Sequence, residues 1–105
     1  MSRKIYKLCL VRGFTEAYHQ LSEEGKQSIW NEVESAMKKA DSKMVTPYYN
    51  CRWSNEQYQT FFIIEYPDAD AAIADATHME NANWHRYINA ETILAYDGGM
   101  ETANT

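Results

Sequence analysis

A chain of 105 residues is long enough for one folded domain and too short for two, so we expect residues 1–105 to form a single domain. Its 45% hydrophobic and 24% charged residues exclude a disordered or collagen-like chain. A net charge of −5 argues against nucleic acid and anionic membranes as partners, because both are bound through clusters of Lys and Arg.

The first third of the chain predicts a strand followed by helices. Side chains alternate over residues 5–11 as they do in a strand. Thr15 is placed to cap a short helical turn over residues 16–18, and Ser22 to cap the main helix. Apolar residues recur at helical spacing in the main helix and predict its buried stripe: Ile29, Val33, Ala36, Met37 and Ala40.

Two further strands are expected in the middle of the chain. Residues 44–53 include Pro47, which cannot donate a hydrogen bond to a ladder, so this strand is expected at a sheet edge. Residues 58–66 are apolar on both faces, which is typical of a strand in the middle of a sheet. Pro67 follows and ends that strand.

The last third predicts a second helix and a final strand. Asp68 is expected to cap this helix, and its predicted buried stripe consists of Ala69, Ala72, Ile73 and Ala76. Its acidic residues, Asp68, Asp70 and Asp75, are assigned to the solvated face. A short helical turn over residues 84–88 leads to a strand over residues 92–96. We expect a core of about residues 4–97 and a frayed tail over residues 98–105.

This order of elements predicts an α+β fold. Strand, helix, strand, strand, helix, strand is the βαββαβ pattern of a ferredoxin-like sandwich: a four-stranded antiparallel sheet with both helices on one face. The connection rules place the first and third strands in the middle. Both of these strands are mostly apolar on two faces, and two helices cover only one. Because exposed apolar surface costs about 25 cal/mol per Å², we expect a homodimer with the two sheets face to face.

The pattern over roughly residues 4–97 resembles the dimeric α/β-barrel superfamily. Residues 21–24 (LSEE), 62–68 (FIIEYPD) and 83–88 (NWHRYI) are similar to small uncharacterised darcynin-like barrel proteins. The resemblance implies a fold and a dimer but no single reaction, because the superfamily includes monooxygenases, isomerases, haem-degrading enzymes and stress-response proteins. Its haem-degrading members use an Asn on the first strand. Here that strand carries Lys7 and Cys9 instead, so we expect no haem. The glycines are dispersed except Gly98 and Gly99 and form no phosphate-binding loop, and no other cofactor is expected.

Targeting signals and metal motifs are not found in the sequence. No apolar run approaches the ~20 residues of a membrane-spanning helix, and Lys7 and Arg12 interrupt the apolar stretch near the start. Cys9 and Cys51 lie far apart, which predicts reduced thiols rather than a disulfide. The histidines do not have His-x-His or His-Glu-x-x-His spacing, so no metal site is expected. These observations predict a cytoplasmic protein.

Three residues are candidates for catalysis. His78 could act as a general base near neutral pH, with a histidine at a helix end as the structural alternative. Asn50 and Arg52 share one face of the predicted second strand with Tyr48, where they could bind a carboxylate or polarise a carbonyl. The alternative for this polar trio is the exposed side of an edge strand.

Residues of several types are candidates for binding a substrate: Tyr48, Lys7, Phe61, Trp84 and His85. Lys7 is unusual in a central strand, and an ion pair with Glu65 on the neighbouring strand is its structural alternative. Trp84 would otherwise serve as a core or dimer anchor, and His85 as a surface residue.

The sequence leaves three functions open. The first is a protein that holds a small apolar or aromatic molecule in a pocket between sheet and helices. The second is a cofactor-independent monooxygenase, isomerase or cyclase acting on an aromatic or polyketide-like compound. The third is a structural dimer whose interior is filled by side chains. A closed pocket that receives Asn50, Arg52 or His78 would favour the enzyme.

Overall fold

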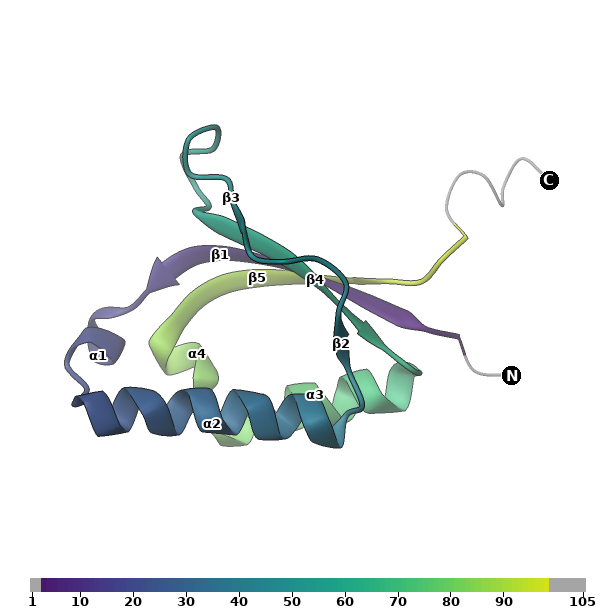
Figure 1. The fold of residues 1–105 in the computed structure, drawn as a ribbon, viewed down its shortest axis with the longest axis horizontal. Helices are drawn as coiled ribbons and strands as arrows, with labels where there is room; N and C mark the ends of the chain where they lie inside the picture. Colours follow the sequence, from purple (N-terminus) through teal and green to yellow (C-terminus); the bar gives the residue numbers. More distant parts are fainter. Residues whose placement is uncertain (1–2, 99–105) are drawn as a thin grey trace.

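This computed structural model describes residues 3–98 of the chain (Figure 1). These residues contain five strands and four helices. In chain order the elements are β1 (Ile5–Phe14), α1 (Glu16–His19), α2 (Glu23–Lys39), β2 (Lys43–Met44), β3 (Tyr49–Asn50), β4 (Thr60–Tyr66), α3 (Ala69–Asn81), α4 (Trp84–Tyr87) and β5 (Ile88–Ala95). The expected tail lies, apart from Gly98, outside these residues. Within them no helix is both long and apolar enough to cross a membrane.

The strands form one open antiparallel sheet in the order β2–β4–β1–β5, with β3 also paired to β4. The helices all lie on one side of the sheet, where α2 and α3 run beneath it (Figure 1). This is an α+β arrangement of the ferredoxin-like type, and β1 and β4 occupy the middle of the sheet. The sequence predicts that its first and third strands lie in the middle of the sheet, and this order agrees with that prediction.

The helices begin at the residues that the sequence predicts. The Ser22 hydroxyl accepts a hydrogen bond of 3.0 Å from the Gly25 backbone N–H at the start of α2. The Asp68 carboxylate accepts one of 2.8 Å from the Ala71 N–H at the start of α3. These side chains satisfy donors that have no partner inside the helix, and thus fix where each helix begins.

The second predicted strand is wrong as a continuous element. It is divided into β2 and β3, and Pro47 lies in the gap. There the Thr46 hydroxyl accepts the Ile63 N–H of β4 at 3.0 Å, in place of a backbone carbonyl. The edge position that Pro47 predicts is nevertheless confirmed, because β2 and β3 pair only with β4 within residues 3–98.

The end of β1 and the start of β5 also differ from the prediction. β1 continues to Phe14 rather than ending at residue 11, and β5 begins at Ile88 rather than residue 92. The β1–β5 register shifts between Val11 and Gly13, and Gly13 has φ of 149°, which other residues rarely adopt. An irregularity at this glycine therefore allows the ladder to continue past the predicted end.

The core lies between the sheet and the helices and centres on Tyr66, which is fully buried. The predicted stripe of α3 is mostly wrong, because only Ala72 of its four residues is buried. Ala69 and Ala76 are exposed, and Ile73 is 62% exposed. Asp75, which was expected on the solvated face, is only 4% exposed. The helix is therefore rotated relative to the prediction, and it directs a carboxylate towards the sheet.

Within residues 3–98, no helix covers the opposite face of the sheet (Figure 1). Leu8 of β1 lies in register with Ile63 on β4 and Ile93 on β5, and Ile93 is 54% exposed. In the next row of this face, Leu10 lies in register with Phe61. Apolar side chains from all three strands thus form one continuous row on the uncovered face.

A polar cluster limits this apolar surface on one side. Arg12 forms an ion pair with Glu91, and the Tyr58 hydroxyl donates a hydrogen bond of 2.8 Å to the same carboxylate. The hydrogen bond from the Arg12 guanidinium, followed by the one from the Tyr58 hydroxyl, holds the pKa of Glu91 below its usual value. The uncovered face therefore combines an apolar middle with a charged border.

Candidate functional site

A cavity of about 480 Å³ lies between the sheet and the helix layer. Its walls come from the helix-facing side of β1, β4 and β5 and from α2, α3 and α4. Most of its lining side chains are apolar: Cys9, Val11, Phe14, Trp30, Val33, Met37, Phe62, Ile64, Ala72, Ala76, Met79, Trp84, Ile88, Ala90 and Leu94. We call this space the inner cavity. Its volume lies within the ~300–1,000 Å³ of typical small-molecule pockets.

One charged pair lies in the wall of the inner cavity. Lys7 Nζ of β1 is 3.2 Å from Asp75 Oδ2 of α3, and their side chains are 18% and 4% exposed. The Tyr66 hydroxyl donates a hydrogen bond to the same oxygen, and Lys7 Nζ also lies 5.4 Å from the centre of the Tyr66 ring. Asp75 thus balances the charge of Lys7, and a second donor secures its carboxylate.

The sequence predicted a different partner for Lys7. Glu65 lies opposite Tyr6 in the β1–β4 ladder, whereas Lys7 lies opposite Ile64. Residues opposite each other share a face of the sheet, so Glu65 points away from Lys7, and its carboxylate lies 3.7 Å from Lys4 Nζ instead. The predicted Lys7–Glu65 pair is therefore wrong, and Asp75 is a residue that the sequence analysis missed. Its position three residues after the buried Ala72, on the same helix face, was the available signal.

Burial changes the acidity of two groups beside this pair. Burial, with the hydrogen bond to Asp75 second, raises the pKa of the Tyr66 hydroxyl far above its ordinary value. Burial also raises the pKa of the Cys9 thiol, and the nearby charge of Lys7 only partly opposes this. Cys9 is therefore held as a thiol, which is the unreactive form.

The free energy of unfolding is expected to fall as the pH rises above about 10. The folded protein retains the Tyr66 proton at a pH at which the unfolded chain, with an ordinary pKa of 10.0, has released it. This contribution is complete below pH ~10 and is lost at about 1.4 kcal/mol per pH unit above it. Urea unfolding of the wild type and of Tyr66→Phe at pH ~8 to ~11.5 measures it. The variant should show the shallower decline, and equal slopes would contradict the assignment.

Aromatic side chains enclose the inner cavity where β1 ends. This end of the strand lies towards α1 and α4 (Figure 1). The Trp30 indole N–H donates a hydrogen bond of 3.0 Å to the Tyr18 hydroxyl, and Phe14 stacks on Tyr18 with ring centres 4.2 Å apart. Trp84 meets Trp30 edge-on at 5.6 Å. This packing fixes the orientation of both indoles that line the cavity.

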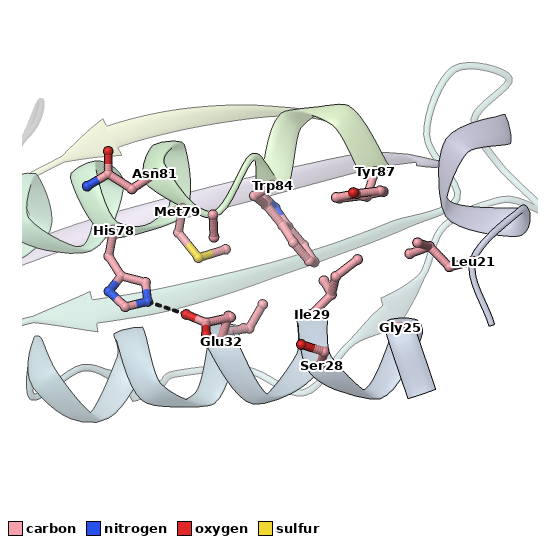
Figure 2. A pocket seen from close by; sticks show the side chains of 12 residues that line it. Leu21, Gly25, Ser28, Ile29, Glu32, His78, Met79, Asn81, Trp84 and Tyr87 are labelled. Carbon is pink, nitrogen blue, oxygen red and sulfur yellow. Dashed lines mark hydrogen bonds and ion pairs between the residues drawn. The ribbon is translucent and has the colours of Figure 1, made fainter. Parts of the chain in front are cut away.

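A second cavity of about 640 Å³ lies on the other side of Trp84, between α2 and the α3–α4 segment (Figure 2). We call it the outer cleft. Small residues of α2, Gly25 and Ser28, lie along its floor and leave room for it. His78 Nε2 of α3 lies 2.9 Å from Glu32 Oε2 of α2, so the two helices are bridged at one end of the cleft (Figure 2).

The predicted site residues are distributed over four places. Lys7, Tyr48, Trp84 and His85 line the inner cavity, and Tyr48 packs edge-on against Phe62 at 4.8 Å. His78 lines the outer cleft. Together these positions bring four of the five predicted substrate-binding residues to one cavity.

The other three predicted residues lie elsewhere. Phe61 lies opposite Leu10, on the uncovered face of the sheet. Asn50 and Arg52 are exposed, and neither lines the inner cavity or the outer cleft. The shared strand face expected for them does not form, because β3 ends at Asn50, whose side chain accepts the Arg52 backbone N–H at 3.0 Å in a turn.

Metal-binding clusters of three or more His, Cys, Asp or Glu side chains do not occur among the described residues. Cys9 and Cys51 are both free cysteines. The inner cavity thus offers an apolar surface with one ammonium–carboxylate pair. Its other polar lining side chains are those of Tyr48, Gln59, Thr60, His85 and Thr92.

Comparison with known proteins identifies the fold and nothing further. No model of a known protein family matches the chain, and no curated protein matches it. The chain is similar to the crystal structure of methylated RPA0582 protein, with a TM-score of 0.62 and 16% identity over 91% of this chain and 82% of that one. It is also similar to RPA0582, a protein of unknown function from Rhodopseudomonas palustris, with a TM-score of 0.62 and 18% identity over 90% and 82% of the two chains. At such identities the likeness concerns the backbone arrangement alone.

Proposed function

We propose that the protein binds a small, mostly aromatic or aliphatic molecule with one hydrogen-bond-accepting oxygen in the inner cavity. The observation that supports this proposal is the apolar cavity of about 480 Å³ with a single Lys7–Asp75 pair in its wall. Apolar pockets with a few placed polar groups are the usual form of small-molecule sites. A protein that served only as a scaffold would be expected to fill this space with side chains.

Lys7 determines the chemistry of the bound oxygen. An ammonium group has three N–H donors, and Asp75 accepts one of them. A carboxylate, phenolate or carbonyl oxygen of the ligand accepts another, beside a lysine side chain that is only 18% exposed. A hydrogen bond of this charged kind contributes about 1.5–3 kcal/mol, so the ligand should be an anion or a carbonyl compound rather than an amine.

Binding without catalysis fits the described residues better than an enzyme that relies on the predicted catalytic trio. Asn50 and Arg52 line neither cavity, and His78 lies in the outer cleft. Catalysis of the isomerase or monooxygenase kind would instead have to use polar side chains that line the inner cavity, such as Lys7, Asp75 and His85. The test of that alternative is turnover of a bound carbonyl compound.

Filling the inner cavity is expected to abolish binding of an aromatic carboxylate. Ala76 of α3 lines the cavity, so Ala76→Phe should raise the dissociation constant of 2-naphthoate at least about tenfold by occupying its space. The matched control is Ala74→Phe, two residues away on the exposed side of the same helix, which should bind as the wild type does. Isothermal titration calorimetry measures both constants. Equal affinities in the two variants would place the probe elsewhere, and no binding to the wild type would reject the proposal.

We further propose that the protein is a homodimer, as in the dimeric α/β-barrel superfamily that the sequence resembles. The support is the row formed by Leu8, Ile63 and Ile93 on the uncovered face, with its charged border at Arg12 and Glu91. An apolar middle with a polar rim is the usual composition of a protein interface. A second copy of the same sheet would cover this row with a matching one.

A further inference from the structure

The outer cleft differs from the inner cavity in the charge that it presents. Its lining includes one carboxylate, Glu32, and one imidazole, His78, and within residues 3–98 no Lys or Arg side chain contributes to it. The inner cavity instead contains the ammonium group of Lys7 paired with the carboxylate of Asp75, so its charges balance. Val33, Met79 and Trp84 line both spaces and form a common wall between them.

The carboxylate of Glu32 is available to a ligand. It is 53% exposed as a side chain, and His78 occupies only its Oε2 atom. The Oε1 atom of Glu32 has no hydrogen-bond partner among residues 3–98, so an ammonium group beside it is favoured. Partial enclosure by α2 and α3 strengthens such an attraction relative to one at an open surface.

The remainder of the cleft suits a flat apolar body. Figure 2 shows Met79 of α3 next along the cleft from His78, then Trp84 of α4 with Ile29 of α2 opposite it, and Tyr87 and Leu21 towards the far end. Aromatic and aliphatic side chains therefore continue from the Glu32–His78 pair along the cleft. Its volume of about 640 Å³ is sufficient for a molecule with two fused rings.

We propose that the outer cleft is a second binding site, which takes an arylalkylamine in its cationic form. The ammonium group donates to Glu32, and the ring packs against Trp84, Ile29 and Met79. The site shares a wall with the inner cavity, and its charged group for a ligand is a carboxylate, whereas the inner cavity has the Lys7–Asp75 pair. It does not depend on whether the inner cavity binds an anion.

The experiment compares two probes of similar shape at pH ~8, 2-naphthylmethylamine and 2-naphthoate, by isothermal titration calorimetry. Glu32→Gln should raise the dissociation constant of the amine about tenfold and leave that of 2-naphthoate unchanged. The matched control is Glu34→Gln, which removes the same charge from an exposed position of α2 and should leave both constants unchanged.

A second pair of variants tests the location without changing charge. Ser28 lines the cleft and Gln27 does not, so Ser28→Phe should weaken amine binding while Gln27→Phe should not. Circular dichroism establishes that each variant is folded. Loss of 2-naphthoate binding alone would reject the inner site and leave the outer one standing. An amine that binds Glu32→Gln as tightly as the wild type, or does not bind the wild type at all, would overturn the outer site.

Discussion

Replacing Asp75 with alanine is expected to lower the free energy of unfolding by about 3–5 kcal/mol. The substitution leaves the Lys7 ammonium without its counter-ion at 18% side-chain exposure, and leaves the buried Tyr66 hydroxyl without its acceptor. Both losses add to the cavity that a missing carboxylate creates. Urea unfolding at neutral pH measures the change.

The matched control is the double variant Lys7→Met/Asp75→Asn. It removes both charges, fills the volume of the lysine stem with an apolar chain and retains an amide oxygen as acceptor for Tyr66. It should recover most of the lost stability, because burying an unpaired charge costs far more than removing the pair. If Asp75→Ala costs less than about 1 kcal/mol, the pair is not a structural element of the folded protein.

Replacing Leu8 with glutamate is expected to convert a dimer into a folded monomer. Leu8 lies in the middle of the uncovered apolar row, and a two-fold arrangement would bury a carboxylate from each copy there without a partner. A penalty of about 4 kcal/mol corresponds to a roughly thousandfold increase in the dissociation constant. Sedimentation equilibrium over a range of protein concentrations measures it.

The control for this prediction is Ile73→Glu. Ile73 is also an exposed aliphatic residue, at 62%, but it lies on α3 in the helix layer. The wild type and this variant should both sediment with twice the mass of one chain. A wild type that remains a monomer at high concentration would contradict the proposed dimer. It would leave the proposed binding in the inner cavity unaffected, because that cavity lies within one chain.

The parts of the fold that local chemistry determines could be predicted from the sequence. Ser22 and Asp68 predict where α2 and α3 begin, because their side chains accept hydrogen bonds from backbone N–H groups only three residues away. Pro47 predicts a position at the sheet edge, because it lacks the N–H group that a central strand needs. Such signals are contained within a few consecutive residues, and the structure agrees with them.

The parts that depend on distant pairing could not be predicted. The partner of Lys7 depends on the β1–β4 register, which places Glu65 on the other face, and on the rotation of α3, which brings Asp75 inward. The small alanines of α3 do not define that rotation, because they can pack or be exposed at little cost. The position of Phe61 could not be predicted for the same reason. It was a candidate for substrate binding, but the β1–β4 register directs its side chain to the uncovered face.

The gap between β2 and β3 has a consequence for self-assembly through the sheet edge. An uninterrupted edge strand offers a row of free N–H and C=O groups to which a strand of another molecule can add, which is the first step towards fibrous aggregates. Here Pro47 lacks the donor, and the Thr46 side chain rather than its backbone bonds to β4. An incoming strand would meet a broken template on this side of the molecule, so growth of a continuous intermolecular sheet from it is disfavoured.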